Sequence, residues 1–211
     1  MLRHGSEPSM KIYLVGGAVR DMLLGRPVTD RDYLVDHAAQ DSFKARYPTA
    51  RLVGKSFPVF LLDGNEYAWP RGGSIEADLE LRDLTINAMA LDEHGVLTAH
   101  PKALEDLRAG VLRPCSERSM AMDPLRVFRA ARFAALFPDF TASPELLEAM
   151  RREAESGSLA GCAAERVGGE VRKALAAPMP SRFFDILEKS GCLGPWFPEV
   201  AACVGIPAGP A

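Results

Sequence analysis

Two aspartates one residue apart, Asp30 and Asp32, stand close behind a paired glycine in the segment IYLVGGAVRDMLLGRPVTDRDYLV. On a β-strand, residues two positions apart project from the same face, so both carboxylates can meet one divalent cation. Two like charges held so close are costly unless a metal or a strong donor stands between them. The pattern therefore indicates a metal site, with a polar turn of surface aspartates as the plainer alternative.

The paired glycine, Gly16 and Gly17, ends a strand-like run and leads into a helix-like stretch. Free backbone N–H groups at such a junction attract anions, and the missing side chains let a phosphate approach closely. Arg20 and Arg26 add positive charge. A tight turn alone would use the same glycines, and their spacing is not that of the Rossmann or P-loop fingerprints. Beside the aspartates, however, the glycines favour a phosphate-binding element next to a metal pair.

Further along the chain, the carboxylate of Asp123 and the guanidinium of Arg126 lie at positions i and i+3 of a predicted helix and so share a face. A carboxylate acceptor beside a guanidinium donor can imitate a Watson–Crick edge. The alternative is that Asp123 caps the helix before Pro124 and pairs with Arg126 for stability. Arg129 and Arg132 extend the stripe at the same spacing, where they could meet phosphate or RNA.

The elements that must position these residues change in type along the chain. Short strand-like runs alternate with helices up to about Pro114, and the later pattern is helical. We expect strands at 11–17 and 30–36, a helix at 18–25, a hairpin at 57–69 turning at Asp63-Gly64-Asn65, and a helix or tight turn followed by a strand pair within 82–99. We expect helices within 122–137, 143–155, 163–177 and 180–197. The predicted fold class is α+β, a mixed head followed by an all-helical part.

Composition narrows the class of protein. The chain has 211 residues, 47% hydrophobic and 25% charged, with a net charge of −3, as in ordinary globular proteins. A nucleic-acid partner would therefore need a local basic patch. No run approaches the roughly 18 apolar residues of a membrane span, and the first residues lack the core of a signal peptide, so we predict a cytoplasmic protein. The cysteines and histidines have no metal-ligand spacing, so we expect reduced thiols and no zinc site.

Three motifs in order carry a resemblance to a known family. LVGGAVRDMLLGRPVTDRD, RDLTINAMALD (82–92) and DPLRVFRAARFAA (123–135) resemble the class II tRNA nucleotidyltransferases, or CCA-adding enzymes, and the related bacterial poly(A) polymerases. The later ERVGGEVRKAL and FFDILEKSGCLGPWFPEV resemble the helical neck of that family. The resemblance implies a nucleotidyltransferase head with a mixed sheet at 11–113 and an all-helical neck at 114–204. A flexible arm at 1–10 and a linker-like tail at 205–211 would flank them.

The resemblance also implies roles for individual residues. Asp30 and Asp32 would be the catalytic pair that binds Mg2+. The nucleotide would be bound by Gly16, Gly17, Arg20, Arg82, Asp83, Asn87, Asp123, Arg126, Arg129 and Arg132. Of these, the two glycines and Arg20 would hold the phosphates. Arg82, Asp83 and Asn87 would line the sugar and phosphates. Asp123 with Arg126 would recognise the base.

Three residues keep an alternative interpretation. Glu66 falls where the family often has a third acid, or is a solvated hairpin residue. Asp21 is expected to be a structural partner of a nearby arginine. Asp83 would also cap the segment LTINAMAL.

The implied function is template-independent, magnesium-dependent addition of CMP and/or AMP from CTP/ATP to an RNA 3′-end, with tRNA as the expected acceptor. The alternatives are a CC-only or poly(A)-adding variant, or a non-catalytic nucleotide- or RNA-binding homologue. No membrane partner is expected, and the sequence leaves the oligomeric state open.

The chain departs from the family pattern in several places. Leu81 replaces an arginine, Met122 replaces an acid, and His100-Pro101-Lys102-Ala103 stands where the family has DPxGG. Only GGSIEADLEL joins Arg71 to Arg82, where typical members carry a longer segment with a flexible loop needed for adding A. This shortening favours CC-only addition. The family continues into further domains, so we expect either an abbreviated homologue or part of a longer chain.

Overall fold

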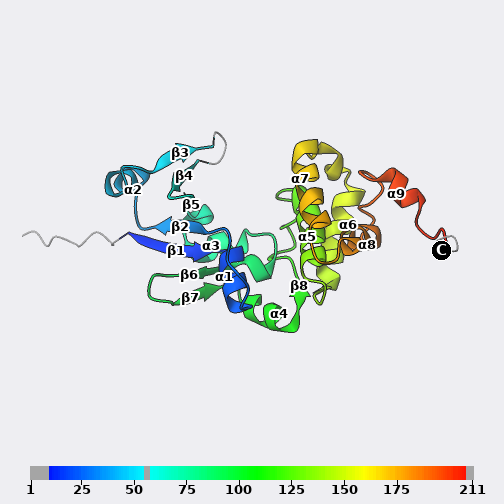
Figure 1. Ribbon diagram of the computed structural model, residues 1–211, viewed down its shortest axis with the longest axis horizontal. Coiled ribbons are helices and arrows are strands. Elements are labelled where there is room, and N and C mark those ends of the chain that lie inside the picture. The colour runs from blue at the N-terminus through cyan, green and yellow to red at the C-terminus, as the bar shows by residue number, and fades with distance from the viewer. Residues whose placement is uncertain (1–9, 55–57, 208–211) are drawn as a thin grey trace, which may run out of the picture. The chain divides into compact units, whose positions relative to one another are not determined.

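The computed structural model describes residues 10–54 and 58–207. Most of the predicted arm, Phe57 of the predicted hairpin, and residues 208–211 of the predicted tail lie outside these ranges. The chain divides into two compact units between Leu104 and Glu105. Figure 1 shows strands in the first unit and mainly helices in the second. The α+β prediction is confirmed, and the predicted domain limits stay predictions.

The described part of the first unit holds a seven-stranded mixed sheet in the order β3-β4-β5-β2-β1-β6-β7. The strands are β1 (Lys11–Val15), β2 (Asp32–Asp36), β3 (Arg51–Val53), β4 (Val59–Leu62), β5 (Asn65–Ala68), β6 (Met89–Leu91) and β7 (Leu97–Ala99). Strands β2 and β5 run parallel, and the other neighbours run antiparallel. The parallel pairing of β2 with β5 matters for the candidate site described below, because it brings two segments that are distant in sequence side by side.

Short helices connect and cover these strands. They are α1 (Gly17–Leu23), α2 (Gln40–Arg46), α3 (Ile75–Glu80) and the 3-10 turns η1 (Arg71–Gly73) and η2 (Thr85–Asn87). Helix α1 contacts β1 and β6, while α3 contacts β6 and β7. The expected tight turn within 82–99 is η2, and the expected strand pair after it is β6 with β7.

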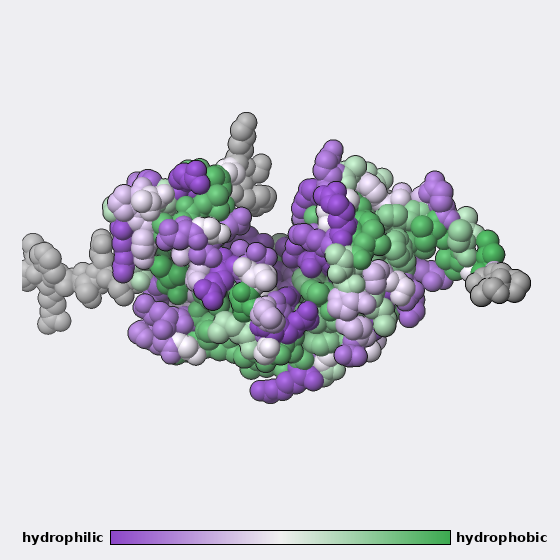
Figure 2. All heavy atoms as spheres, in the orientation of Figure 1, coloured by the Kyte–Doolittle hydropathy of each residue, from purple (hydrophilic) through white to green (hydrophobic). Residues whose placement is uncertain are grey.

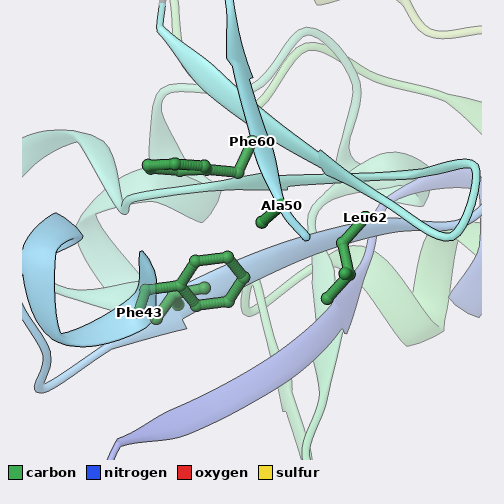
Figure 3. Packing of buried hydrophobic residues seen from close by; sticks show 5 residues of the cluster. Phe43, Ala50, Phe60 and Leu62 are labelled. Carbon is green, nitrogen blue, oxygen red and sulfur yellow. The ribbon is translucent and has the colours of Figure 1, made fainter. Parts of the chain in front are cut away.

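An apolar cluster anchors the β2 side of the sheet. It consists of Val35, Phe43, Ala50, Phe60 and Leu62, all buried. Figure 3 shows Phe43 of α2 near Ala50, with Phe60 and Leu62 carried on β4. Burying these side chains removes apolar surface from water, which fixes α2 and β4 against β2.

The second unit is built around α5. The elements from the division onward are α4 (Ala103–Ala109), β8 (Val111–Leu112), α5 (Leu125–Leu136), β9 (Thr141–Ala142), α6 (Pro144–Glu155), η3 (Ser158–Gly161), α7 (Ala164–Leu175), α8 (Ser181–Lys189) and α9 (Pro198–Ala202). Nine of the twelve residues of α5 are buried, because α7 and α8 both pack against it. Alanines on α5 allow this close approach.

The segment that follows the division packs with the helices. Strand β8 pairs with β9 in parallel, and Arg113, which makes an ion pair with the buried Asp106 at 3.1 Å, also pairs with Glu145 of α6 at 2.8 Å. These contacts explain why residues 105–113 fall in the second unit.

The surface is mixed in character. Figure 2 shows hydrophilic side chains spread over the viewed face, with hydrophobic surface in the helical unit toward α9. The exposed apolar residues in that region are Val200, Val204 and Ile206. Within the described ranges, no helix combines the length and apolar character needed to cross a membrane.

Candidate active site

The acidic residues meet at the start of β2. Asp32 is its first residue, and it lies directly opposite Glu66 of β5 in the parallel register. Asp30 lies in the stretch just before the strand, so the strand predicted at 30–36 is two residues shorter, and strand alternation is not what brings the two aspartates together. An open pocket of about 260 Å³ is formed here, lined by Thr29, Asp30, Arg31, Asp32, Gly64, Asn65 and Glu66. The structure therefore brings the predicted aspartate pair together with Glu66.

The β4–β5 hairpin forms one wall of this pocket. Asp63 and Gly64 form its two-residue turn with φ of 50° and 80°, so both central residues are in the left-handed region that the type I′ turn requires. The hairpin predicted at these residues is confirmed by the pairing of Leu62 with Asn65.

An aromatic pair holds the register that places Asp32 beside Glu66. Tyr33 and Tyr67 are paired across β2 and β5, and their rings stack with centroids 4.8 Å apart. Phe43 packs against Tyr67 from the core, with centroids 5.3 Å apart. Because successive strand residues point to opposite faces, this packing leaves the carboxylates of Asp32 and Glu66 on the other face of the sheet, toward the pocket.

The donor set of the pocket suits a hard cation. The described residues contain no group of three or more His, Cys, Asp or Glu side chains arranged to hold a metal ion. Mg2+ at nucleotide sites is commonly bound by one or two carboxylates together with substrate phosphates and waters. Asp30 and Asp32 therefore fit a two-carboxylate Mg2+ site of this kind.

The glycine turn is built against the second motif. Gly16 has φ of 71°, and its N–H donates to the carbonyl of Met89 at 3.0 Å. A Cβ at this position would lie 2.8 Å from Nη1 of Arg82. The absence of a side chain thus allows both the backbone conformation and the approach of the guanidinium group.

A buried polar framework lies under the turn. Arg20 donates from Nη1 to Oδ1 of Asn87 at 2.5 Å, and from Nη2 to Asp21 at 2.9 Å. Asn87 in turn donates to Oδ1 of Asp83 at 3.2 Å, which also accepts the N–H of Leu84 at 2.8 Å. The expected partnership of Asp21 with an arginine is confirmed. A direct role of Arg20 at the phosphates stays a prediction.

Asp78, which the sequence did not single out, ties this framework to the short segment after Arg71. Its side chain is 2% exposed, and it accepts from Nε of Arg71 at 2.7 Å and from Nε of Arg82 at 3.1 Å. Burial raises the pKa of the Asp78 carboxyl, but the hydrogen bond from Arg71 and the charge of Arg82 outweigh burial, so its pKa lies below the ordinary value. Asp78 is therefore an ionised carboxylate that joins Arg71 and Arg82, and we call this three-residue arrangement the clamp.

In the helical unit, Asp123 and Arg126 have separate supports. Asp123 accepts the N–H of Leu125 at 3.2 Å, as expected of a residue that caps the first turn of α5. Its carboxylate also pairs with Arg166 of α7 at 2.6 Å. Arg126 is buried and donates from Nη1 to the carbonyl of Ser119 at 2.9 Å. Both predicted base-reading residues are thus held in place by other groups of their own unit.

The rest of the arginine stripe contributes to helix packing. Arg132 pairs with Glu170 of α7 at 2.5 Å, and its guanidinium carbon lies 4.2 Å from the ring centroid of Phe133. Arg129 lies 6.0 Å from the same centroid. Their predicted contacts with phosphate or RNA stay predictions.

Comparison with known proteins shows the family. The model of the "Poly A polymerase head domain" matches residues 12–67, and the "Probable RNA and SrmB- binding site of polymerase A" matches residues 139–204. The chain belongs to the poly(A) polymerase and CCA-adding enzyme family. The matched head region contains the glycine turn, Asp30, Asp32 and Glu66, so the pocket lies in the part of the chain that this family shares.

Individual members of the family agree in sequence and fold. The chain is 44% identical to the Multifunctional CCA protein of Chromobacterium violaceum, over 94% of this chain and 53% of that protein. The corresponding protein of Pseudomonas aeruginosa is 45% identical with the same coverage. A solved Thermotoga maritima CCA-adding enzyme complexed with tRNA is 30% identical, with a TM-score of 0.79 over 90% of this chain and 49% of that one. The chain spans about half the length of these family members.

The conformation of Gly16 gives a first testable prediction for this family member. Gly16→Ala is expected to lower the free energy of unfolding by about 2 kcal/mol, because φ is unfavourable for a side chain and the new Cβ crowds Arg82. Urea denaturation measures the loss. Gly25→Ala is the matched control: Gly25 also has a positive φ, 65°, but a Cβ there would meet no atom within 4 Å beyond its chain neighbours. Equal losses for the two variants would show that crowding at Arg82 has no effect.

Proposed function

We propose that the protein is a template-independent, magnesium-dependent nucleotidyltransferase that adds CMP and/or AMP from CTP or ATP to an RNA 3′-end, with tRNA as the acceptor. The observation that carries this proposal is the pocket in which Asp32 stands opposite Glu66 with Asp30 beside it. Solved relatives in complex with ATP, with CTP and with tRNA support these substrates. The absence of a membrane-crossing helix in the described residues is compatible with the predicted cytoplasmic location.

In this mechanism the first unit, which holds the sheet, binds the triphosphate of the nucleotide. Mg2+ held by Asp30 and Asp32 would neutralise phosphate charge and favour ionisation of the attacking 3′-hydroxyl. Gly16 and Gly17 carry no side chains that would block a phosphate, and Gly16 lies beside Arg82, whose orientation Asp78 fixes. The hydroxyl oxygen then bonds to the α-phosphorus, the bond to the bridging oxygen breaks, and pyrophosphate leaves with the hydroxyl proton passing to solvent.

The helical unit reads the base. The Asp123 carboxylate accepts a hydrogen bond, and the Arg126 guanidinium donates one, which matches the edge of cytosine or adenine. The fixed supports of both side chains preorganise this pair, so little ordering is needed when a nucleotide binds.

One observation favours CC-only addition as the product. The segment between Arg71 and Arg82 is folded into η1 and α3, and the buried Asp78 ties both of its ends. A segment clamped in this way has little freedom to rearrange between two nucleotide specificities.

The product pattern tests this proposal. With Mg2+ and a tRNA that lacks the terminal CCA, CTP alone is expected to extend the RNA. With a tRNA that ends in CC and with ATP, no AMP is expected to be added, because the clamped segment limits the enzyme to CTP. Gel separation at single-nucleotide resolution measures both results. Addition of A to the CC end would instead establish full CCA addition, and long A tracts would establish poly(A) addition.

A further inference from the structure

Arg166 grips the carboxylate of Asp123 with both ends of its guanidinium fork. Nη2 lies 2.6 Å from Oδ2 of Asp123, and Nη1 lies 3.4 Å from Oδ1. Arg166 comes from α7 and Asp123 from the turn before α5, so the pair joins two helices of the same unit. Planar, two-point pairing of this kind fixes the orientation of a carboxylate as well as its charge.

The pair remains accessible to a ligand. The side chains of Asp123 and Arg166 are 33% and 55% exposed. An exposed ion pair contributes little to folding stability, so stability gives no adequate reason for this contact. Its effect on what Asp123 can bind is more direct.

The contacts of Asp123 leave a defined capacity for a further hydrogen bond. Among the residues that the structure describes, Oδ1 accepts from Leu125 N–H and from Nη1 of Arg166, whereas Oδ2 accepts from Nη2 of Arg166 alone. An ionised carboxylate has about four acceptor positions and no donor. The remaining position on Oδ2 therefore matches a donor and repels an acceptor. Cytosine and adenine present an amino group at the relevant edge, whereas uracil and guanine present a carbonyl oxygen.

We propose that Arg166 is a positioning residue that sets nucleotide selectivity. It holds the Asp123 carboxylate in a fixed orientation, so that the carboxylate accepts the amino group of cytosine or adenine and rejects the carbonyl of uracil or guanine. This inference rests on the proposed base-reading function of Asp123. Arg126 is held separately by the Ser119 carbonyl, so removing Arg166 leaves that half of the recognition pair supported.

Equilibrium nucleotide binding tests the proposal without requiring turnover. The dissociation constants of CTP and UTP are measured by calorimetry with Mg2+, for the wild-type protein, Arg166→Gln and Arg166→Lys. The preference for CTP over UTP is expected to fall about tenfold or more in Arg166→Gln, and less in Arg166→Lys, which keeps the charge but not the fork. Arg172→Gln, an exposed arginine on the same helix, is expected to keep the wild-type preference.

The outcomes separate this inference from the proposed function. An unchanged preference in Arg166→Gln overturns the role of Arg166, whatever the catalytic activity. Absence of any preference in the wild-type protein overturns base reading by Asp123 and the role of Arg166 together. Selective binding that Arg166→Gln relaxes, in a protein that transfers no nucleotide, supports the role of Arg166 and contradicts only the catalytic proposal.

Discussion

Asp32→Ala is expected to abolish nucleotide transfer while leaving nucleotide binding largely intact. Asp32 is the first residue of β2 and lines the pocket opposite Glu66, so its removal takes away one of the two aspartates proposed to bind the metal. Metal-ion catalysis contributes several kcal/mol, and each 1.4 kcal/mol is about tenfold in rate, so kcat should fall on the order of a thousandfold. Single-turnover incorporation of labelled CMP measures the rate, and calorimetry measures CTP binding.

Asp36 provides the matched control for this substitution. It lies at the other end of β2, four residues along the same strand, and does not line the pocket. Asp36→Ala is therefore expected to keep kcat within about twofold. Retained transfer in Asp32→Ala would contradict the catalytic assignment, and equal losses in both variants would show that damage to β2 is the cause.

Asp78→Asn is expected to produce the largest loss of stability, about 3 kcal/mol in the free energy of unfolding. The substitution leaves Arg71 and Arg82 without their shared carboxylate in a region where Asp78 itself is 2% exposed. Breaking a buried pair by removing one partner costs about 3–5 kcal/mol, and the partial exposure of both arginines places the effect at the lower end. Urea denaturation at neutral pH measures it.

The same carboxyl predicts a dependence of stability on pH. The pKa of Asp78 in the folded protein lies below its ordinary value, so the unfolded chain binds more protons on acidification. The contribution of Asp78 is fully present above the ordinary pKa of about 3.9 and is lost as the pH falls through the lower folded-state pKa. Asp78→Asn should therefore show a shallower loss of stability below about pH 4 than the wild-type protein.

Asp106→Asn separates stability from nucleotide binding. Asp106 is also buried and pairs with an arginine, Arg113, but it lies in the helical unit. Both variants should lose stability, whereas only Asp78→Asn should weaken CTP binding, because Arg82 then loses the support that holds it at Gly16. Equal CTP affinity in the two variants would contradict this role of the clamp.

Local sequence signals predicted much of the fold. Alternation and turn residues located the β4–β5 hairpin at Asp63 and Gly64, and the helix predicted within 143–155 is α6. Such signals depend on neighbouring residues alone. The parallel pairing of β2 with β5 joins distant segments, so the position of Glu66 opposite Asp32 became visible only in the folded chain.

The arginines show where local sequence is insufficient. Charge and family resemblance for Arg20, and helical spacing for Arg132, predicted contacts with phosphate or RNA. In the folded chain both are engaged by side chains of the protein, Asn87 and Glu170 among them, and the phosphate or RNA contacts stay predictions. A guanidinium group binds a carboxylate as readily as a phosphate, and sequence does not show which partner the fold supplies. One signal was available for Asp78: it shares the buried face of α3 with Ile75 and Leu79, and an acid on an apolar face implies a buried partner.

The most direct test of nucleotidyl transfer is the mass of a tRNA before and after incubation with the protein. The tRNA lacks its terminal CCA, the reaction contains CTP, ATP and Mg2+, and a full-length CCA-adding enzyme serves as the positive control. The proposed function predicts that the mass rises by whole nucleotide increments, of CMP and/or AMP, and that Asp32→Ala leaves it unchanged. An unchanged mass with the wild-type protein, alongside extension by the control enzyme, would contradict nucleotidyl transfer and leave a nucleotide- or RNA-binding role.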